Sequence, residues 1–359
     1  LMHKWVNQFT LKSTITPTKA LMIMPKLNWN VYREKADYCY GQLDTTAVRT
    51  SYTYEPSIFL KWKMSRVRNM DISFAYNTSV PDFISTLGYR DTTDPLSVST
   101  GNPLLHKSHS HTTTYNYHRM WLRKQIMLGL NVSYNKDINP IATLYRYNST
   151  TGAYESKPMN VKGGDMWKFG VNYDQGIGVY FRLMNKFKVL TSKSYGFLTI
   201  VDNNDPNAVP DLNLQKRLGI DENMELSYEA EKVQLTLFND LQWNRYRYDD
   251  DTYNSSPLYN SLGISATLKL SPFEMYIRLS DDFRKGYATS EMNGHKLMSM
   301  ASISYGFCKN KCRLSLFVDD IFNNDIWYDN NYSAFQRTET TTNYMHHYAN
   351  LKFSYRFDA

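Results

Sequence analysis

The sequence has no long hydrophobic run. Its 359 residues contain no stretch of about 18 apolar residues, which excludes a transmembrane helix. Hydrophobic residues make up 42% of the chain and the mean hydropathy is −0.54, an average polarity typical of a soluble protein. A membrane-spanning β-barrel is compatible with these values, because its strands alternate lipid-facing and lumen-facing residues.

Cysteine is scarce, and positive charge is not concentrated. Three cysteines in 359 residues exclude a fold held together by disulfides. The formal net charge is +7, but the 41 Lys and Arg residues are scattered and form no dense basic run. We therefore expect no nucleic acid among the partners.

Motifs of enzymes and of cofactor sites are also missing. The sequence contains no GxSxG, no HExxH and no Cys–His arrangement of a catalytic kind. The glycines at Gly163–Gly164, Gly176 and Gly178 lack the strand–helix context of a phosphate-binding loop. The sequence therefore predicts that the chain is not an enzyme and needs no cofactor.

Aromatic residues are abundant instead. The chain has 29 Tyr, 17 Phe and 7 Trp, which together make 15% of its residues. A tyrosine ring has an apolar body and a polar tip, so it suits a membrane interface or a tyrosine-rich binding surface.

Apolar and polar residues alternate along most of the chain, which is the period of β-strands. Near the end of the chain, Leu351, Phe353, Tyr355 and Phe357 alternate with Asn350, Lys352, Ser354 and Arg356. Earlier segments repeat the pattern, and we count about fifteen strands, within the range of membrane barrels.

The connections between these strands are alternately short and long. Tight links are expected near Met64–Val67, His118–Leu122, Asp174–Gly178, Glu229–Lys232, Ser271–Phe273 and Cys308–Lys311. Long polar links are expected at Glu34–Arg49, Thr78–His106, Val201–Asp211, Asp249–Pro257, Lys285–His295 and Asn323–Tyr344. A soluble β-sandwich also has alternating strands. However, this rhythm and the long continuous segments Tyr180–Ile200 and Trp121–Tyr147 favour an outer-membrane barrel with periplasmic turns and extracellular loops.

Alternation also predicts the direction of side chains. We expect lipid to face the apolar set Ile264, Leu268, Leu314, Leu316, Leu351 and Phe353, and the lumen to face the polar set Thr267, Lys269, Lys352 and Ser354. Matching the apolar faces pairs Phe307 with Cys312 and Tyr305 with Leu314. The sulfurs of Cys308 and Cys312 would then project to opposite sides, which predicts no disulfide between them.

Two clusters could bind a metal ion. On a strand, His109 and His111 would direct both imidazoles to one side, but no carboxylate or cysteine has matching spacing. The acidic run Asp249–Asp251 lacks the spaced oxygen ligands of a calcium loop. We therefore predict no metal site, with His109 and His111 as the candidates to examine.

The acidic pairs Asp281–Asp282 and Asp319–Asp320 lie near strand ends. Paired carboxylates can serve in acid–base catalysis, but nothing in the sequence fixes their separation. No ligand-binding residue can be named from the sequence.

Several segments resemble known outer-membrane proteins. YANLKFSYRF at Tyr348–Phe357 resembles the C-terminal strand that these proteins present to the barrel-assembly machinery, although Asp358 and Ala359 follow it. LSLFVDDIFN at Leu314–Asn323 resembles the end of the penultimate strand of TonB-dependent receptors. DPLSVSTGNPLL at Asp94–Leu105 and the segment Asn139–Tyr147 resemble the outer-membrane β-barrel branch of that superfamily.

The resemblance implies an all-β fold, a large antiparallel up-and-down transmembrane β-barrel. Residues 1–359 would form one outer-membrane β-barrel domain, without a plug domain or a signal peptide. The strand pattern is already present at Leu1–Trp5 and the strand count is odd. We therefore expect a C-terminal fragment of a barrel of about 22 strands, with a gap between the first and last strands.

Complete members of this superfamily are energised importers. The resemblance therefore implies import of a scarce nutrient, namely an iron or metal chelate, a peptide or an oligosaccharide, across the outer membrane of a Gram-negative cell. Expected partners are outer-membrane lipid, the TonB complex through a plug domain, a surface lipoprotein or other protein, and the small nutrient ligand. The expected capture loops are Thr78–His106, Val201–Asp211 and Asn323–Tyr344. The alternative is a barrel that transports nothing and acts as a binding, assembly or secretion scaffold.

Overall fold

The computed structural model of the chain describes residues 2–40, 43–148, 151–197, 201–202, 212–309, 311–323, 327–332, 337–342 and 347–357. Nearly all regular structure in these residues is β-sheet. Four short 3-10 helices lie in connections: η1 (Ile84–Thr86), η2 (Leu122–Lys124), η3 (Asp251–Tyr253) and η4 (Ser290–Met292). None of the helices in the described residues is long and apolar enough to cross a membrane.

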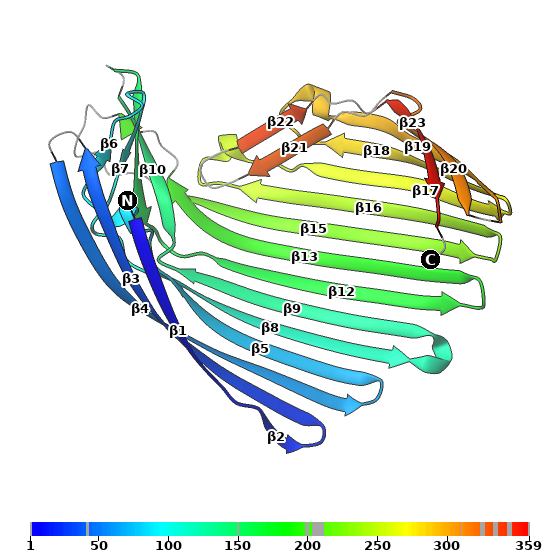
Figure 1. Cartoon of the computed structure of the whole chain (residues 1–359), viewed down its shortest axis with the longest axis horizontal. Helices are drawn as coiled ribbons and strands as arrows, with labels where there is room; N and C mark the ends of the chain where they lie inside the picture. The colour runs from blue at the N-terminus through cyan, green and yellow to red at the C-terminus, as the bar shows by residue number, and fades with distance from the viewer. Residues whose placement is uncertain are drawn as a thin grey trace.

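One 16-stranded sheet forms a curved wall (Figure 1). Its strands follow the chain as antiparallel neighbours, and the short β2 (Ile15–Thr18) pairs with β3 on the side that β1 also occupies. The remaining strands are β1 (Met2–Lys12), β3 (Leu21–Tyr40), β4 (Leu43–Ser65), β5 (Arg68–Ser79), β8 (Ser108–Trp121), β9 (Ile126–Ile138), β12 (Asp165–Ile177), β13 (Phe181–Phe197), β15 (Leu212–Glu229), β16 (Val233–Arg247), β17 (Leu258–Leu270), β18 (Phe273–Lys285), β19 (Gly294–Phe307), β20 (Cys312–Asp319) and β23 (Tyr348–Tyr355). The predicted antiparallel up-and-down wall is confirmed.

The wall is open along one side. Among the described residues, β1 pairs with β3 and β23 pairs with β20, and the two edge strands do not pair with each other. The predicted gap between the first and last strands is therefore observed. That further strands complete a barrel of about 22 remains an expectation.

The strand pairing separates apolar from polar side chains. One row across five strands consists of Leu268, Met275, Ile303, Leu316 and Leu351. The row one residue further along consists of Lys269, Glu274, Ser304, Ser315 and Lys352. Because side chains in a strand alternate between faces, the first row lies on one face and the second on the other. The predicted separation of the apolar set from the polar set is confirmed, and the assignment of the apolar set to lipid stays a prediction.

The two ends of the wall differ as predicted. Tight turns gather at one end, together with the end of β23, where the Arg356 amide donates to the Lys311 carbonyl at 2.8 Å (Figure 1). The long connections Thr78–His106 and Asn323–Tyr344 begin at the opposite end. Two turns lie a few residues later than expected, at 122–125 and 178–180.

The predictions for two segments are wrong. Glu34–Arg49 is not a polar loop, because β3 and β4 stay paired as far as Tyr40 and Leu43. Trp121–Tyr147 is not one strand, because it breaks at 122–125 and again at Asn139, where φ is 51°. Asparagine tolerates this left-handed backbone, and the following Pro140 cannot donate to a ladder.

The turn between β19 and β20 confirms the predicted register but corrects one side-chain direction. Phe307 pairs with Cys312 and Tyr305 with Leu314, as alternation predicts. Cys308 begins the turn with a φ of 54°, so its side chain no longer follows strand alternation. Its thiol lies within hydrogen-bonding reach of Cys312, and both cysteines are free. The opposite projection of the two sulfurs was therefore wrong, while the absence of a disulfide stays a prediction.

Long connections build two smaller sheets. A five-stranded sheet has the order β14 (Val201–Asp202), β10 (Ile141–Asn148), β11 (Ala153–Asn160), β7 (Ser97–Thr100) and β6 (Arg90–Asp91). It draws on three connections, and β10–β14 and β11–β7 are parallel pairs. Its core contains Leu144, Val161 and Phe197. The second is the hairpin of β21 (Trp327–Tyr332) and β22 (Arg337–Thr342).

Candidate functional site

The hairpin β21–β22 lies against the polar face of the wall at the loop end. The ring of Tyr332 stacks on Tyr246 of β16, with centroids 4.6 Å apart. Tyr328 accepts a hydrogen bond from the Lys296 Nζ at 2.7 Å, and the Arg284 guanidinium lies 5.0 Å from its ring centroid. Lys296, Arg284 and Tyr246 all belong to the polar set of their strands. The hairpin therefore turns inward, toward the lumen.

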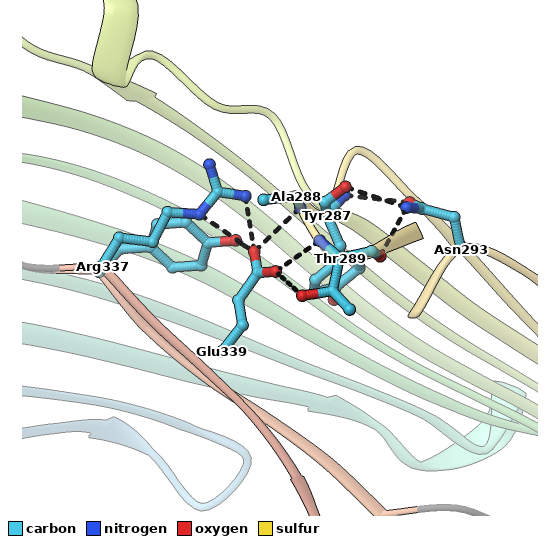
Figure 2. Close-up of polar contacts among 7 residues, drawn as sticks. Tyr287, Ala288, Thr289, Asn293, Arg337 and Glu339 are labelled. Carbon is cyan, nitrogen blue, oxygen red and sulfur yellow. Dashed lines mark hydrogen bonds and ion pairs between the residues drawn. The ribbon is translucent and has the colours of Figure 1, made fainter. Parts of the chain in front are cut away.

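Glu339 of β22 holds the hairpin to the connection between β18 and β19 (Figure 2). Its carboxylate accepts hydrogen bonds from the Ala288 amide at 3.1 Å, and from the Thr289 amide and hydroxyl at 2.9 and 3.0 Å. The Tyr332 hydroxyl donates to it at 2.9 Å, and Arg337 donates from Nε at 3.0 Å and from Nη2 at 2.5 Å. Six donors from two connections thus converge on one carboxylate.

The protonation of Glu339 follows from these contacts. Burial by itself would raise its pKa, but hydrogen bonds from Arg337, from the amides of Thr289 and Ala288 and from Tyr332 outweigh burial and lower the pKa to about 2. The side chain is 6% exposed. Burial and the carboxylate raise the pKa of Tyr332 above its ordinary value. At neutral pH the site therefore contains an ionised Glu339 and a protonated Tyr332.

The β18–β19 connection is shaped to present its amides. Asn293 closes it, because its Oδ1 accepts from the Tyr287 amide at 3.0 Å and its Nδ2 donates to the Tyr287 and Thr289 carbonyls at 2.9 and 3.1 Å. Gly286 has a φ of 84°, and a Cβ there would lie 2.4 Å from the Ser256 carbonyl oxygen. The close approach of this backbone to the β16–β17 connection therefore requires glycine.

Polar networks continue down the lumen face of the wall. Asp282 accepts hydrogen bonds from the Ser261 and Tyr259 hydroxyls at 2.6 and 3.0 Å. The Asn131 amide donates to Asn116 at 2.5 Å. These groups offer hydrogen bonds to a polar ligand. Arg284 and Lys296 add cations, and Tyr246, Tyr328 and Tyr332 add ring faces.

The histidines considered for metal binding lie elsewhere. His109 and His111 share one side of β8, as predicted, but it is the apolar side. His109 stacks on Tyr76 with centroids 5.5 Å apart, and His111 lies 5.9 Å from Tyr134. Within the described ranges, no three His, Cys, Asp or Glu side chains gather as a metal site would require. The two imidazoles belong to a cluster of rings at the loop end of the apolar face.

The acidic pairs are separated by the structure. Asp281 lies 2.8 Å from His295 on the apolar side, whereas Asp282 lies in the lumen network. Asp320 is 2% exposed and lies in the corner after β20, where the Asn323 amide donates to its carbonyl at 2.9 Å. In the run Asp249–Asp251, Asp250 caps η3 by accepting from the Thr252 amide. Each group has a local structural partner.

The expected capture loops are distributed over the loop end. Thr78–His106 contributes β6 and β7 to the five-stranded sheet, and Asn323–Tyr344 contributes the hairpin. Of Val201–Asp211, residues 203–211 lie outside the described residues. The Glu339 site was missed from the sequence. The only signal was that Arg337 and Glu339 alternate on one side of a short polar strand.

The curved antiparallel wall, its short turns at one end and its two-faced strands define an outer-membrane β-barrel protein. Residues 40–355 match the model of the family described as "Outer membrane protein beta-barrel family". The chain belongs to this family, and the protein is located in the outer membrane. Among curated proteins, none matches the chain.

Two solved structures are similar to the chain at low identity. The open form of the ferric-catecholate import receptor Fiu from E. coli K12 is 9% identical with a TM-score of 0.44, over 88% of this chain and 58% of the receptor. The β domain of the Bordetella autotransporter BrkA is 9% identical with a TM-score of 0.24, over 85% of this chain and 99% of that domain. The chain thus spans less than two thirds of the length of the receptor.

Proposed function

We propose that the chain is the barrel wall of a TonB-dependent importer for a scarce extracellular nutrient. The observation that carries the proposal is the inward position of the hairpin β21–β22. It brings Tyr328 beside Arg284 and Lys296, and Tyr332 against Tyr246, at the loop end of the lumen. A ligand entering there meets ring faces and cations before it reaches the polar wall below.

The roles of these groups follow from their chemistry. The tyrosine rings would stack on a sugar, an aromatic chelate or a peptide side chain. Arg284 and Lys296 would bind carboxylate or other anionic groups of the ligand. The hairpin would be displaced for passage, and the TonB complex would supply the energy through a plug domain. The proposal includes no catalytic step and no resident cofactor.

Growth under limitation tests the proposal. A strain lacking the full-length protein is supplied with ferric chelates, peptides or oligosaccharides as the limiting nutrient. We expect a defect for one class, an equal defect when TonB is inactivated, and partial loss in an Arg284→Gln/Lys296→Gln double variant. The matched control is Lys309→Gln/Lys311→Gln, which removes the same charge at the opposite end. Normal growth on all classes would contradict import.

A scaffold without transport is the second candidate. The five-stranded sheet favours it, because Tyr145 and Tyr154 are 41% and 44% exposed on the side opposite the core residue Leu144. Such a surface suits a surface lipoprotein or another protein partner. A scaffold predicts that nutrient uptake is normal in the deletion strain while the amount of another outer-membrane protein falls.

A further inference from the structure

Two neighbouring turns at the periplasmic end of the wall have an unbalanced charge. The β4–β5 turn carries Lys63, Arg66 and Arg68, and the β8–β9 turn carries Arg119, Arg123 and Lys124. The segments 62–70 and 117–128 contain no Asp or Glu. Because β5 and β8 are paired, these six cations lie along one short stretch of the rim.

Two of the arginines are directly opposite each other. Arg68 and Arg119 are Cα partners in the β5–β8 ladder. Their neighbours Asn69 and His118 belong to the polar set, so both arginines lie on the lipid-facing side. The Arg119 guanidinium lies 4.3 Å from the ring centroid of Trp121. Neither arginine forms an ion pair with a carboxylate of the described residues.

This arrangement needs an anion from outside the chain. Like charges that face each other across a ladder destabilise the sheet, and the side chains of both turns offer no counter-charge. The surface next to the pair is apolar toward the middle of the membrane, since the following pair on the same face is Met70 and Tyr117. An anion that suits this place therefore carries an apolar part.

The depth of the pair identifies the source of the anion. His111 belongs to the ring cluster at the loop end of β8, and Trp121 lies at the turn end of the same strand. About ten residues at about 3.4 Å each, in a strand tilted by about 40°, span about 25 Å, which is the height of the apolar band of a membrane barrel. Arg119 starts two residues further inside this band, but its guanidinium lies 4.3 Å from the Trp121 ring centroid, so the charge is at the level of the phospholipid headgroups of the inner leaflet.

We propose that Arg68 and Arg119 bind the phosphate of an anionic phospholipid in the inner leaflet of the outer membrane. Each guanidinium offers planar paired donors that match phosphate oxygens. Arg66, Arg123 and Lys124 surround the headgroup, while Met70 and Tyr117, the next pair on the same face toward the middle of the membrane, contact the first part of its acyl chains. The negative charge of the phosphate thereby offsets the repulsion between the two arginines, and the lipid fixes this part of the wall at its depth.

Retention of lipid by the purified protein tests the site. The full-length protein in detergent is mixed with phosphatidylglycerol or phosphatidylcholine, and bound lipid is counted by native mass spectrometry. Arg68→Gln/Arg119→Gln is compared with the matched control Lys61→Gln/Lys63→Gln, which removes the same charge from the lumen side at the same end. Each variant is first checked for folding by its heat-dependent gel mobility. If the arginine variant does not fold, Arg68→Lys/Arg119→Lys replaces it.

We expect wild type and the lysine control to prefer phosphatidylglycerol. The arginine variant should lose affinity by about fivefold per arginine, or about twenty-five-fold for both, and Arg→Lys should lose less. Equal losses in the arginine and lysine variants, or no loss in either, would overturn the proposal. Displacement of the lipid by inorganic phosphate alone would assign the site to a free anion. Stronger binding of a polyglutamate peptide than of the lipid would assign it to a protein partner.

Discussion

The wall and the loop-built sheets consist of the same elements but are held in different ways. In the wall, neighbouring strands are joined by ladders that are mostly continuous, and rows such as Leu268 to Leu351 cross several of them. The hairpin β21–β22 depends on Glu339 and a few rings, and the five-stranded sheet on a core around Leu144. A repeated pattern makes the wall robust, whereas the loop structures depend on single residues and should respond to single substitutions.

The largest expected effect is in the wall. Ile264→Arg places a charge on the lipid-facing row, where Ile264 is 48% exposed. Near the middle of the bilayer this should cost about 2–4 kcal/mol of the free energy of unfolding, measured by denaturant titration in phospholipid vesicles. Thr267→Arg on the lumen side of the same strand is the control and should cost much less. The reverse order would show that the faces are assigned wrongly.

A substitution in the loop core should act locally. Leu144 is 1% exposed, so Leu144→Ala leaves a cavity beside Val161 and Phe197. We expect a local loss of about 2 kcal/mol, seen as faster hydrogen exchange of amides in β10 and β11. Exchange in β12 and in the part of β13 away from Phe197 should not change. Faster exchange there as well would mean that the loop sheet and the wall unfold together.

The contact of Glu339 with the β18–β19 connection should weaken when its charge is removed. Glu339→Gln keeps the shape but removes the charge that Arg337 and the two amides stabilise. We expect hairpin docking to weaken by about 1–2 kcal/mol, with faster exchange of the Ala288 and Thr289 amides. Glu291→Gln, at an exposed position in η4, is the control. Unchanged exchange in Glu339→Gln would show that the carboxylate does not hold the hairpin in place.

The same contact predicts a pH dependence. The pKa of Glu339 in the docked hairpin is about 2, below the ordinary value of 4.5. A lowered pKa stabilises the docked form above pH 4.5, and this contribution is lost as the pH falls from 4.5 toward 2. Exchange of the Thr289 amide, corrected for its intrinsic pH dependence, should show this loss in the wild type and not in Glu339→Gln. Equal pH profiles would contradict the lowered pKa.

The same difference explains what could be predicted from the sequence. A two-residue period and turn residues were enough for the wall, its faces and the Phe307–Cys312 register, because these features are local or repeated. The parallel pairs β10–β14 and β11–β7 join separate loops, and alternation within a segment carries no information about such partners. Local pattern also failed where single residues decide the backbone, as at Asn139 and Cys308.

The candidate site was harder to predict for the same reason. The loop Asn323–Tyr344 could be assigned to the correct end of the wall from strand order. Its inward direction depends on Glu339 meeting Thr289 and on Tyr332 meeting Tyr246, contacts between residues far apart in the chain. No spacing in the sequence encodes them.

The central claim is that the turns face the periplasm and the hairpin end faces outward. Labelling of intact cells tests it most directly, with a maleimide on a polymer too large for porins and with the native cysteines replaced. Asp251→Cys in η3 and Glu231→Cys in the β15–β16 turn are both exposed and lie at opposite ends. We predict that Asp251→Cys is labelled on intact cells and Glu231→Cys only after the outer membrane is permeabilised. Labelling of Glu231→Cys on intact cells, with Asp251→Cys protected, would contradict the account.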